Sequence, residues 1–91
     1  MLEVTVHIHE VRRQAVVESP DVAFLTTVLN QLQEFGLNCV RKGKEVECVV
    51  MRPTDISTFL QVVNNVAMMF HVNTNESSNV EAENEGNSLL V

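Results

Sequence analysis

Two histidines, His7 and His9, have a type and spacing that suit metal binding. Residues two apart on a strand project from the same face, so both imidazoles could reach one ion. Glu45 and Glu47 could sit across from them and add carboxylates. A zinc site needs a third or fourth well-placed ligand, however, and a structural histidine pair on a half-exposed sheet is the commoner arrangement. We therefore predict no metal, and expect the imidazoles to make any interface on this face change strength between about pH 5 and 7.

Positive charge is the second feature that could do chemistry. Five of the six basic residues lie in two short segments, and a sheet whose first strand ends beside the central hairpin would bring these segments together. Such a cluster could hold a phosphate, an acidic peptide or the chain's own acidic tail. Solvated loop charges, balanced by Glu10, Glu18 and Glu45, are the preferred interpretation. The candidate anion- or partner-binding residues are Arg12, Arg13, Arg41, Lys42 and Lys44.

Familiar catalytic motifs are missing from the sequence. It has no G-x-S-x-G, no H-E-x-x-H, no glycine-rich phosphate loop and no C-x-x-C. Its three glycines leave no cradle for a nucleotide. We therefore predict that the chain is not an enzyme, with no catalytic residue and no cofactor.

The two cysteines, Cys39 and Cys48, fall in a predicted hairpin over residues 37–51. A two-residue loop at Lys42-Gly43 pairs Cys39 with Val46, which makes the two cysteines diagonal neighbours and a disulfide poorly aligned. Two reduced thiols in the core are the preferred interpretation. No secretory signal is predicted, so we expect the cytosol or another reducing intracellular compartment.

The order of elements indicates the fold. Residues 2–9 alternate as a strand does, and residues 11–17 either extend this strand, which is the favoured interpretation, or return as a hairpin. Ser19-Pro20 begins a helix that ends at Gly36, the hairpin follows, and a second helix begins at Arg52-Pro53. Residues 70–72 end that helix or form a short edge strand.

This order predicts an α+β fold, a β-α-β-β-α(-β) two-layer sandwich of ferredoxin-like type. Its antiparallel sheet would carry two helices on one face, and its third strand would lie between the first two. Residues 1–72 would form a single domain. Residues 73–91, rich in Asn, Glu and Ser, would be a disordered acidic tail.

The amino-acid composition argues against two classes of partner, nucleic acids and membranes. The net charge is −6, and Trp and Tyr are absent, which argues against nucleic-acid binding. No apolar run approaches the roughly 20 residues that a membrane span needs. We therefore expect a protein partner and no membrane.

Residues 28–40 (VLNQLQEFGLNCV) resemble the first helix and second strand of an ACT domain. In that family a helix ends at a glycine, here Gly36, and enters a strand through a pair similar to Leu37-Asn38. The resemblance implies a regulatory module that binds amino acids.

Surplus apolar surface points instead to a protein-interaction module, which is the function we predict. The chain would act as a homodimer or as an accessory or inhibitory subunit of a larger complex. An ACT-like small-molecule sensor is the alternative, and binding of nucleic acid or another anion at a basic end of the sheet is less favoured. The interface candidates are Val40, Val49, Val62, Met68, Met69, His7 and His9.

Overall fold

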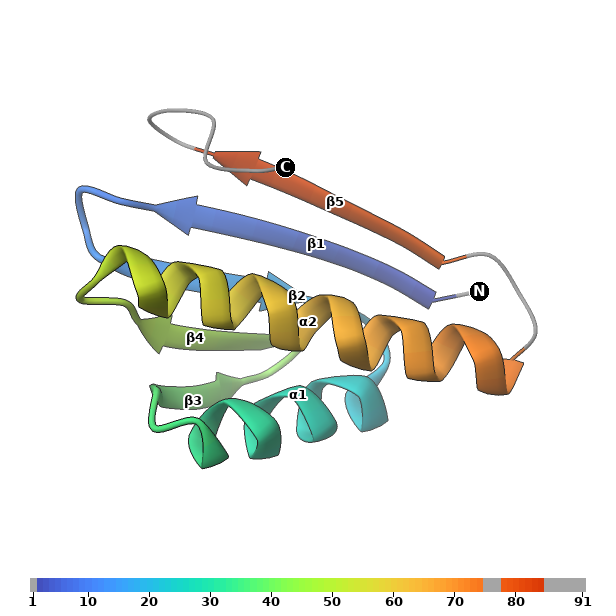
Figure 1. The fold of residues 1–91 in the computed structure, drawn as a ribbon. Helices are drawn as coiled ribbons and strands as arrows, with labels where there is room; N and C mark the ends of the chain where they lie inside the picture. Colours follow the sequence, from blue (N-terminus) through green and yellow to red (C-terminus); the bar gives the residue numbers. More distant parts are fainter. Residues whose placement is uncertain (1, 75–77, 85–91) are drawn as a thin grey trace.

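The computed structural model describes residues 2–74 and 78–84, with side chains as far as Phe70. Five strands form one sheet in the order β3-β4-β2-β1-β5, and both helices cover the same face of it (Figure 1). The predicted ferredoxin-like α+β sandwich is therefore confirmed. The elements are β1 (Leu2–His9), β2 (Gln14–Glu18), α1 (Val22–Glu34), β3 (Asn38–Lys42), β4 (Glu45–Val49), α2 (Pro53–Thr74) and β5 (Ser78–Asn84).

The first strand is followed by a hairpin, so the favoured interpretation of one long strand was wrong. β1 and β2 pair antiparallel, with Val6 opposite Val17. The turn between them closes through Arg13, whose N–H donates to the Glu10 carbonyl at 3.0 Å and whose φ is +54°. Left-handed backbone is uncommon for a residue with a Cβ, so an arginine there gives no turn signal in the sequence.

The predicted arrangement of the central strands is observed. β4 lies between β2 and β3 and runs antiparallel to both, as expected for the third strand of the split arrangement. β1 is an additional strand on the other side of β2. β5 pairs with β1 in parallel, so the sheet is antiparallel only from β3 to β1.

The C-terminal segment differs from its prediction. α2 continues to Thr74, past the predicted boundary at residue 72 and through the possible edge strand at residues 70–72. Seven residues of the predicted disordered tail form β5, in register from Leu2 opposite Ser78 to Ile8 opposite Asn84. Backbone groups on the outer edge of β1 give this segment hydrogen-bond partners that the polar composition does not reveal. Residues 75–77 and 85–91 lie outside the described residues, and the wider division into domain and tail stays a prediction.

The start of α1 lies later than predicted. Asp21, not Ser19, is the N-cap, and its carboxylate accepts from the Phe24 N–H at 3.1 Å. Ser19 supports the cap, because its hydroxyl oxygen accepts from the Asp21 N–H at 3.1 Å. Gly36 follows the helix with a φ of +88°, as its predicted role at the C-terminal end requires.

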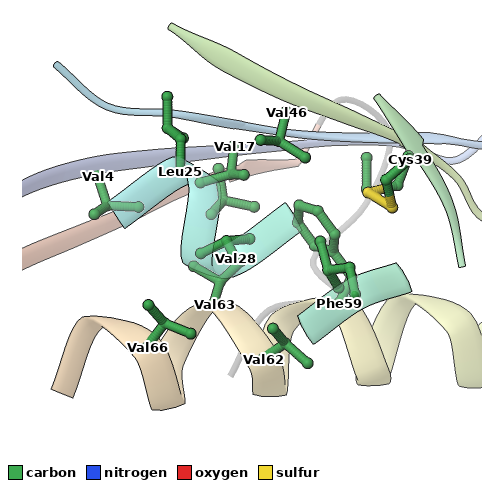
Figure 2. Close-up of a cluster of buried hydrophobic side chains, with 14 of the residues drawn as sticks. Val4, Val17, Leu25, Val28, Cys39, Val46, Phe59, Val62, Val63 and Val66 are labelled. Atoms are coloured by element: carbon green, nitrogen blue, oxygen red, sulfur yellow. A yellow bond between two sulfur atoms is a disulfide. The ribbon is translucent and has the colours of Figure 1, made fainter. Parts of the chain in front are cut away.

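The core lies between the sheet and the two helices (Figure 2). Val62 belongs to it, being only 2% exposed, so its placement among the interface candidates was wrong. α2 packs against both α1 and the sheet, which buries a wider arc of the helix than one apolar stripe. Strands, α1 and α2 each contribute, for example Val4, Val17, Val46, Leu25, Val28, Phe59, Val63 and Val66.

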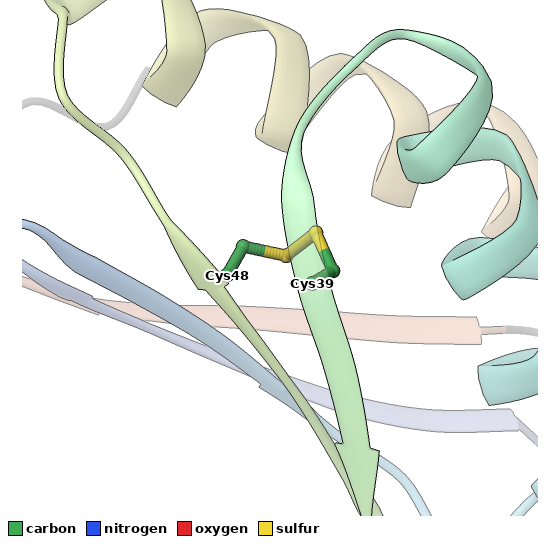
Figure 3. Close-up of a disulfide and its surroundings, with 2 residues drawn as sticks. All are labelled: Cys39 and Cys48. Carbon is green, nitrogen blue, oxygen red and sulfur yellow. A yellow bond between two sulfur atoms is a disulfide. The ribbon is translucent and has the colours of Figure 1, made fainter.

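Cys39 and Cys48 are directly opposite each other, with 4.1 Å between their Cα atoms, and form a disulfide (Figure 3). The interpretation as two reduced thiols was therefore wrong. The reason is the turn, which is Gly43-Lys44 rather than Lys42-Gly43. Gly43 has a φ of +59°, as a glycine does at the first central position of a type II′ turn. The shift in pairing is by two residues, so every residue keeps the face that the Lys42-Gly43 loop would give it. Both cysteines therefore stay in the core, as predicted.

In the described part of the chain, no helix has both the length and the hydropathy needed to cross a bilayer.

Candidate functional site

The face of the sheet opposite the helices, from β3 to β1, is covered by no other element in the described part of the chain (Figure 1). We call it the open face. Because side chains alternate along a strand, every second residue projects from it, and the strand register aligns these residues in rows. From β3 to β1 the rows are Asn38, Val49, Gln14 and His9; Val40, Glu47, Val16 and His7; and Lys42, Glu45, Glu18 and Thr5.

Apolar exposure on the open face is concentrated toward β3. Val40 is 51% exposed and Val49 is 45% exposed. The two side chains are diagonal neighbours, because Val40 faces Glu47 while Val49 faces Asn38. The structure thus brings together two of the predicted interface residues, on the edge strand β3 and its neighbour β4. Among the described strands, β3 pairs with β4 alone.

The two methionines do not join this surface. Met68 is 64% exposed and Met69 is 48% exposed, but both lie on α2, which covers the other face of the sheet. They therefore form a separate exposed area.

The histidines share the open face, as predicted. Their rings are stacked, with centroids 6.2 Å apart and planes inclined by 11°. Glu18 lies beside His7, with 3.6 Å between the Glu18 Oε1 and the His7 Nε2. Glu45 and Glu47 are on β4, and β2 separates that strand from β1, so these acids do not sit across from the histidines. Within residues 2–70, whose side chains the structure describes, no group of three His, Cys, Asp or Glu side chains is arranged to hold a metal ion.

A pair of carboxyl groups occupies the end of the open face near the β3–β4 turn. Glu18 on β2 lies directly opposite Glu45 on β4. A side-chain hydrogen bond with Glu18 holds the pKa of Glu45 above its ordinary value of 4.5. Partial burial and the charges of Glu18 and Glu47 raise this pKa further, whereas His7 lowers it. A protonated Glu45 carboxyl can therefore donate a hydrogen bond to Glu18.

Glu18 was absent from the predicted site residues. Its position opposite Glu45 follows only if residues 14–18 form a separate strand paired with β4. Choosing the hairpin for residues 11–17, instead of one long strand, would have placed Glu18 beside the β3–β4 hairpin.

The carboxyl pair borders a hollow of about 420 Å³ on the same end of the open face. Both acidic and basic groups line it, and Lys42 is held toward the sheet by Glu47, with 3.6 Å between the Lys42 Nζ and the Glu47 Oε1. The hollow can thus offer both signs of charge to a small polar molecule. Its lining residues are Glu3, Thr5, Glu18, Ser19, Pro20, Lys42, Lys44 and Glu45.

The basic residues do not form one cluster, so that prediction was wrong. Lys42 and Lys44 lie near the β3–β4 turn, as does Arg41, whose guanidinium donates to the Gly43 carbonyl at 2.6 Å. Arg12 and Arg13 are in the β1–β2 turn at the opposite end, where the Val50 N–H donates to the Arg13 carbonyl at 3.0 Å. The division arises because β2 reverses direction, which brings Glu18 rather than Arg12 to the β3–β4 turn.

Comparison with models of protein families and with curated proteins finds no match. Among solved structures, the chain is similar to a ribosomal processing protease, Prp, from S. aureus in complex with a substrate peptide. The identity is 10% and the TM-score 0.49, over 91% of this chain and 100% of that one. A hypothetical protein from Staphylococcus aureus is matched over the same shares at 10% identity and a TM-score of 0.48. A protein from Streptococcus mutans follows at 11% identity and a TM-score of 0.39, over 93% and 96%.

The protease corrects one prediction. Missing catalytic motifs led us to predict that the chain is not an enzyme, whereas a protein matched over 91% of this chain is a protease. The absence of motifs known from other folds is no ground for excluding an enzyme, so we correct that prediction and withdraw it. At 10% identity the likeness assigns no activity, substrate or partner to this chain.

Proposed function

We propose that the chain is a protein-interaction module that binds its partner at the β3 side of the open face. The observation that carries this proposal is the pair of half-exposed valines, Val40 and Val49, on a sheet face that neither helix covers. Charged side chains border them, among them Lys42 and Glu47, which are 3.6 Å apart. An apolar centre within a polar rim is the usual anatomy of a protein–protein interface.

The charges of this face favour a protein over nucleic acid. Glu18, Glu45 and Glu47 project from the open face on β2 and β4, the strands between β3 and β1. They repel phosphate, and phosphate contacts supply most of the affinity of nucleic-acid binding. The partner is a second copy of the chain or a subunit of a larger complex.

Self-association is the form of this function that can be tested on the purified chain. We expect light scattering to show a dimer, and Val40→Lys to dissociate it, because the new charge is placed in the apolar centre. Met68→Lys is the matched control, since it adds the same charge at a more exposed position on α2. A dimer that survives Val40→Lys but is lost in Met68→Lys contradicts the proposal.

Small-molecule sensing is a second candidate, favoured by the hollow beside the carboxyl pair. Lys42 and Lys44 could hold a carboxylate there, and Glu18 and Glu45 an ammonium group, which suits a zwitterion such as an amino acid. Titration with free amino acids, followed by amide NMR signals, tests this role. Shifts around Ser19 and Glu45 are expected, and unchanged signals at millimolar amino acid would exclude it.

The predicted reducing intracellular compartment stays a proposal. The Cys39–Cys48 disulfide bears against it, because reducing compartments keep most protein thiols free. Counting free thiols in the chain taken from its native compartment decides between the two.

A further inference from the structure

We propose that the partner is a second copy of this chain, joined antiparallel along the outer edge of β3 about a two-fold axis at Val40. This inference rests on the proposed protein-interaction function and names its partner and geometry. β3 is the last strand on its side of the sheet, and in the described parts of the chain no strand pairs with its outer edge. Such an edge presents backbone donors and acceptors to another strand.

The register of the hairpin identifies the residues that present these groups. Cys39 faces Cys48 with a Cα separation of 4.1 Å, the short spacing of a pair without mutual hydrogen bonds. The N–H and C=O of Cys39 therefore point away from β4. Because the pattern alternates along the strand, those of Arg41 point outward as well.

A second copy meets these groups in a matching pattern. When two β3 strands are centred on Val40, Cys39 lies opposite the partner's Arg41, and Arg41 lies opposite the partner's Cys39. Each of these pairs exchanges both N–H···O bonds between residues whose backbone groups already point outward. Val40 then faces its own copy in the closely spaced type of pair, where side chains make the most contact.

Charge selects this register among the neighbouring ones. Centred on Val40, Lys42 faces the partner's Asn38, and no like charges are opposed. Centring the pair on Arg41 would oppose two guanidinium groups, which destabilises a sheet. Centring it on Cys39 would leave Lys42 beyond the end of the partner strand. The Val40 register uses all five residues of β3.

The disulfide and the open face both support such a joint. The Cys39–Cys48 bond ties β3 to β4, so less freedom is lost when the edge pairs with a partner. On the open face, Val40 and Val49 of one copy would continue into the same residues of the other. A single apolar stripe would then cross the joint, flanked by Lys42 and Glu47 of each copy.

Cysteine substitutions in the full chain test the register. Val40→Cys is expected to form an intermolecular disulfide at least about tenfold faster than the exposed control Val22→Cys, because pairing raises the local thiol concentration. Asn38→Cys with Lys42→Cys in one chain should also cross-link, whereas Asn38→Cys alone should not. Peptide mapping separates these products from exchange with the native disulfide.

Arg41→Pro tests the edge without a new thiol. It removes an N–H that points away from β4, so the circular dichroism spectrum is expected to be retained while the dimer is lost. If the wild type is a dimer and Arg41→Pro is also a dimer, the β3 joint is overturned. Equal rates of cross-linking for Val40→Cys and Val22→Cys overturn it as well. Neither result contradicts the proposed protein-interaction function. A wild-type chain that stays monomeric at millimolar concentration overturns the joint and self-association together.

Discussion

Cys39 and Cys48 stand directly opposite each other on β3 and β4, and their disulfide ties the edge strand to the middle of the sheet. Its sequence separation is 9. In the chain-entropy model, a disulfide that closes a loop of this size restricts the unfolded chain and so raises the free energy of unfolding by about 2–3 kcal/mol.

Replacing both cysteines is therefore expected to lower the free energy of unfolding. Cys39→Ala with Cys48→Ala should lose about 2–3 kcal/mol in urea titration, and reductant should have a similar effect on the wild type. The double variant itself should be insensitive to reductant. Equal urea midpoints for wild type with and without reductant would show that the bond does not stabilise the fold.

The opposed carboxyl groups of Glu18 and Glu45 predict a pH dependence. The fold raises the pKa of Glu45 above 4.5, chiefly through the hydrogen bond with Glu18, so the folded state holds a proton that the unfolded state releases. The resulting stabilisation is present below pH 4.5 and is lost as pH rises through the higher, folded-state pKa.

Glu45→Gln should remove this dependence, because the amide keeps a donor for Glu18 and carries no charge. Urea midpoints between pH 4 and 7 are expected to vary less in Glu45→Gln than in wild type. Glu34→Gln on α1 is the matched control and should leave the dependence unchanged. A profile that Glu45→Gln does not flatten would count against the shared proton.

Because Arg13 has a left-handed backbone conformation, we expect a glycine at this position to stabilise the fold. At a φ of +54° a Cβ crowds the backbone, so Arg13→Gly is expected to raise the free energy of unfolding by up to about 1 kcal/mol. Arg12→Gly, one residue earlier, has no such crowding to relieve and should lower it by about 0.5–1 kcal/mol. Urea unfolding of both variants checks the contrast, and equal losses would contradict the turn geometry.

Burial separates two α2 residues that the sequence analysis grouped together. Val62 is 2% exposed and Met68 is 64% exposed. Val62→Ala should therefore cost about 2 kcal/mol, because it leaves a cavity between the helix and the sheet. Met68→Ala should change stability by less than about 0.5 kcal/mol. Similar losses for both variants would contradict the described orientation of α2.

Much of the fold could be predicted because its signals are local. The alternation of Leu2 to His9 and the glycine after α1 each identify an element without reference to the rest of the chain. The antiparallel β3–β4 pair and the face it buries follow from apolar alternation, which survives an error in the turn. These signals were enough to predict the two-layer sandwich and to identify Val40 and Val49 as interface candidates.

The errors that affect the candidate site come from two turns. Arg13 adopts a backbone conformation that its residue type does not favour, so the β1–β2 hairpin was not preferred. That one reversal also separates Arg12 from Lys42 and brings Glu18 opposite Glu45. In the second hairpin, placing Gly43 at the second loop position instead of the first separated Cys39 from Cys48 and concealed the disulfide.

The central claim is that the chain pairs with its own copy through β3, and its mass in solution tests this most directly. Light scattering of the full chain at pH 7.5 and 5.5 should give twice the chain mass of 10.2 kDa at both values, because backbone hydrogen bonds at Cys39 and Arg41 do not titrate in this range. A dimer at only one pH would move the interface to His7 and His9. A mass of 10.2 kDa at both pH values and at millimolar concentration would contradict the claim.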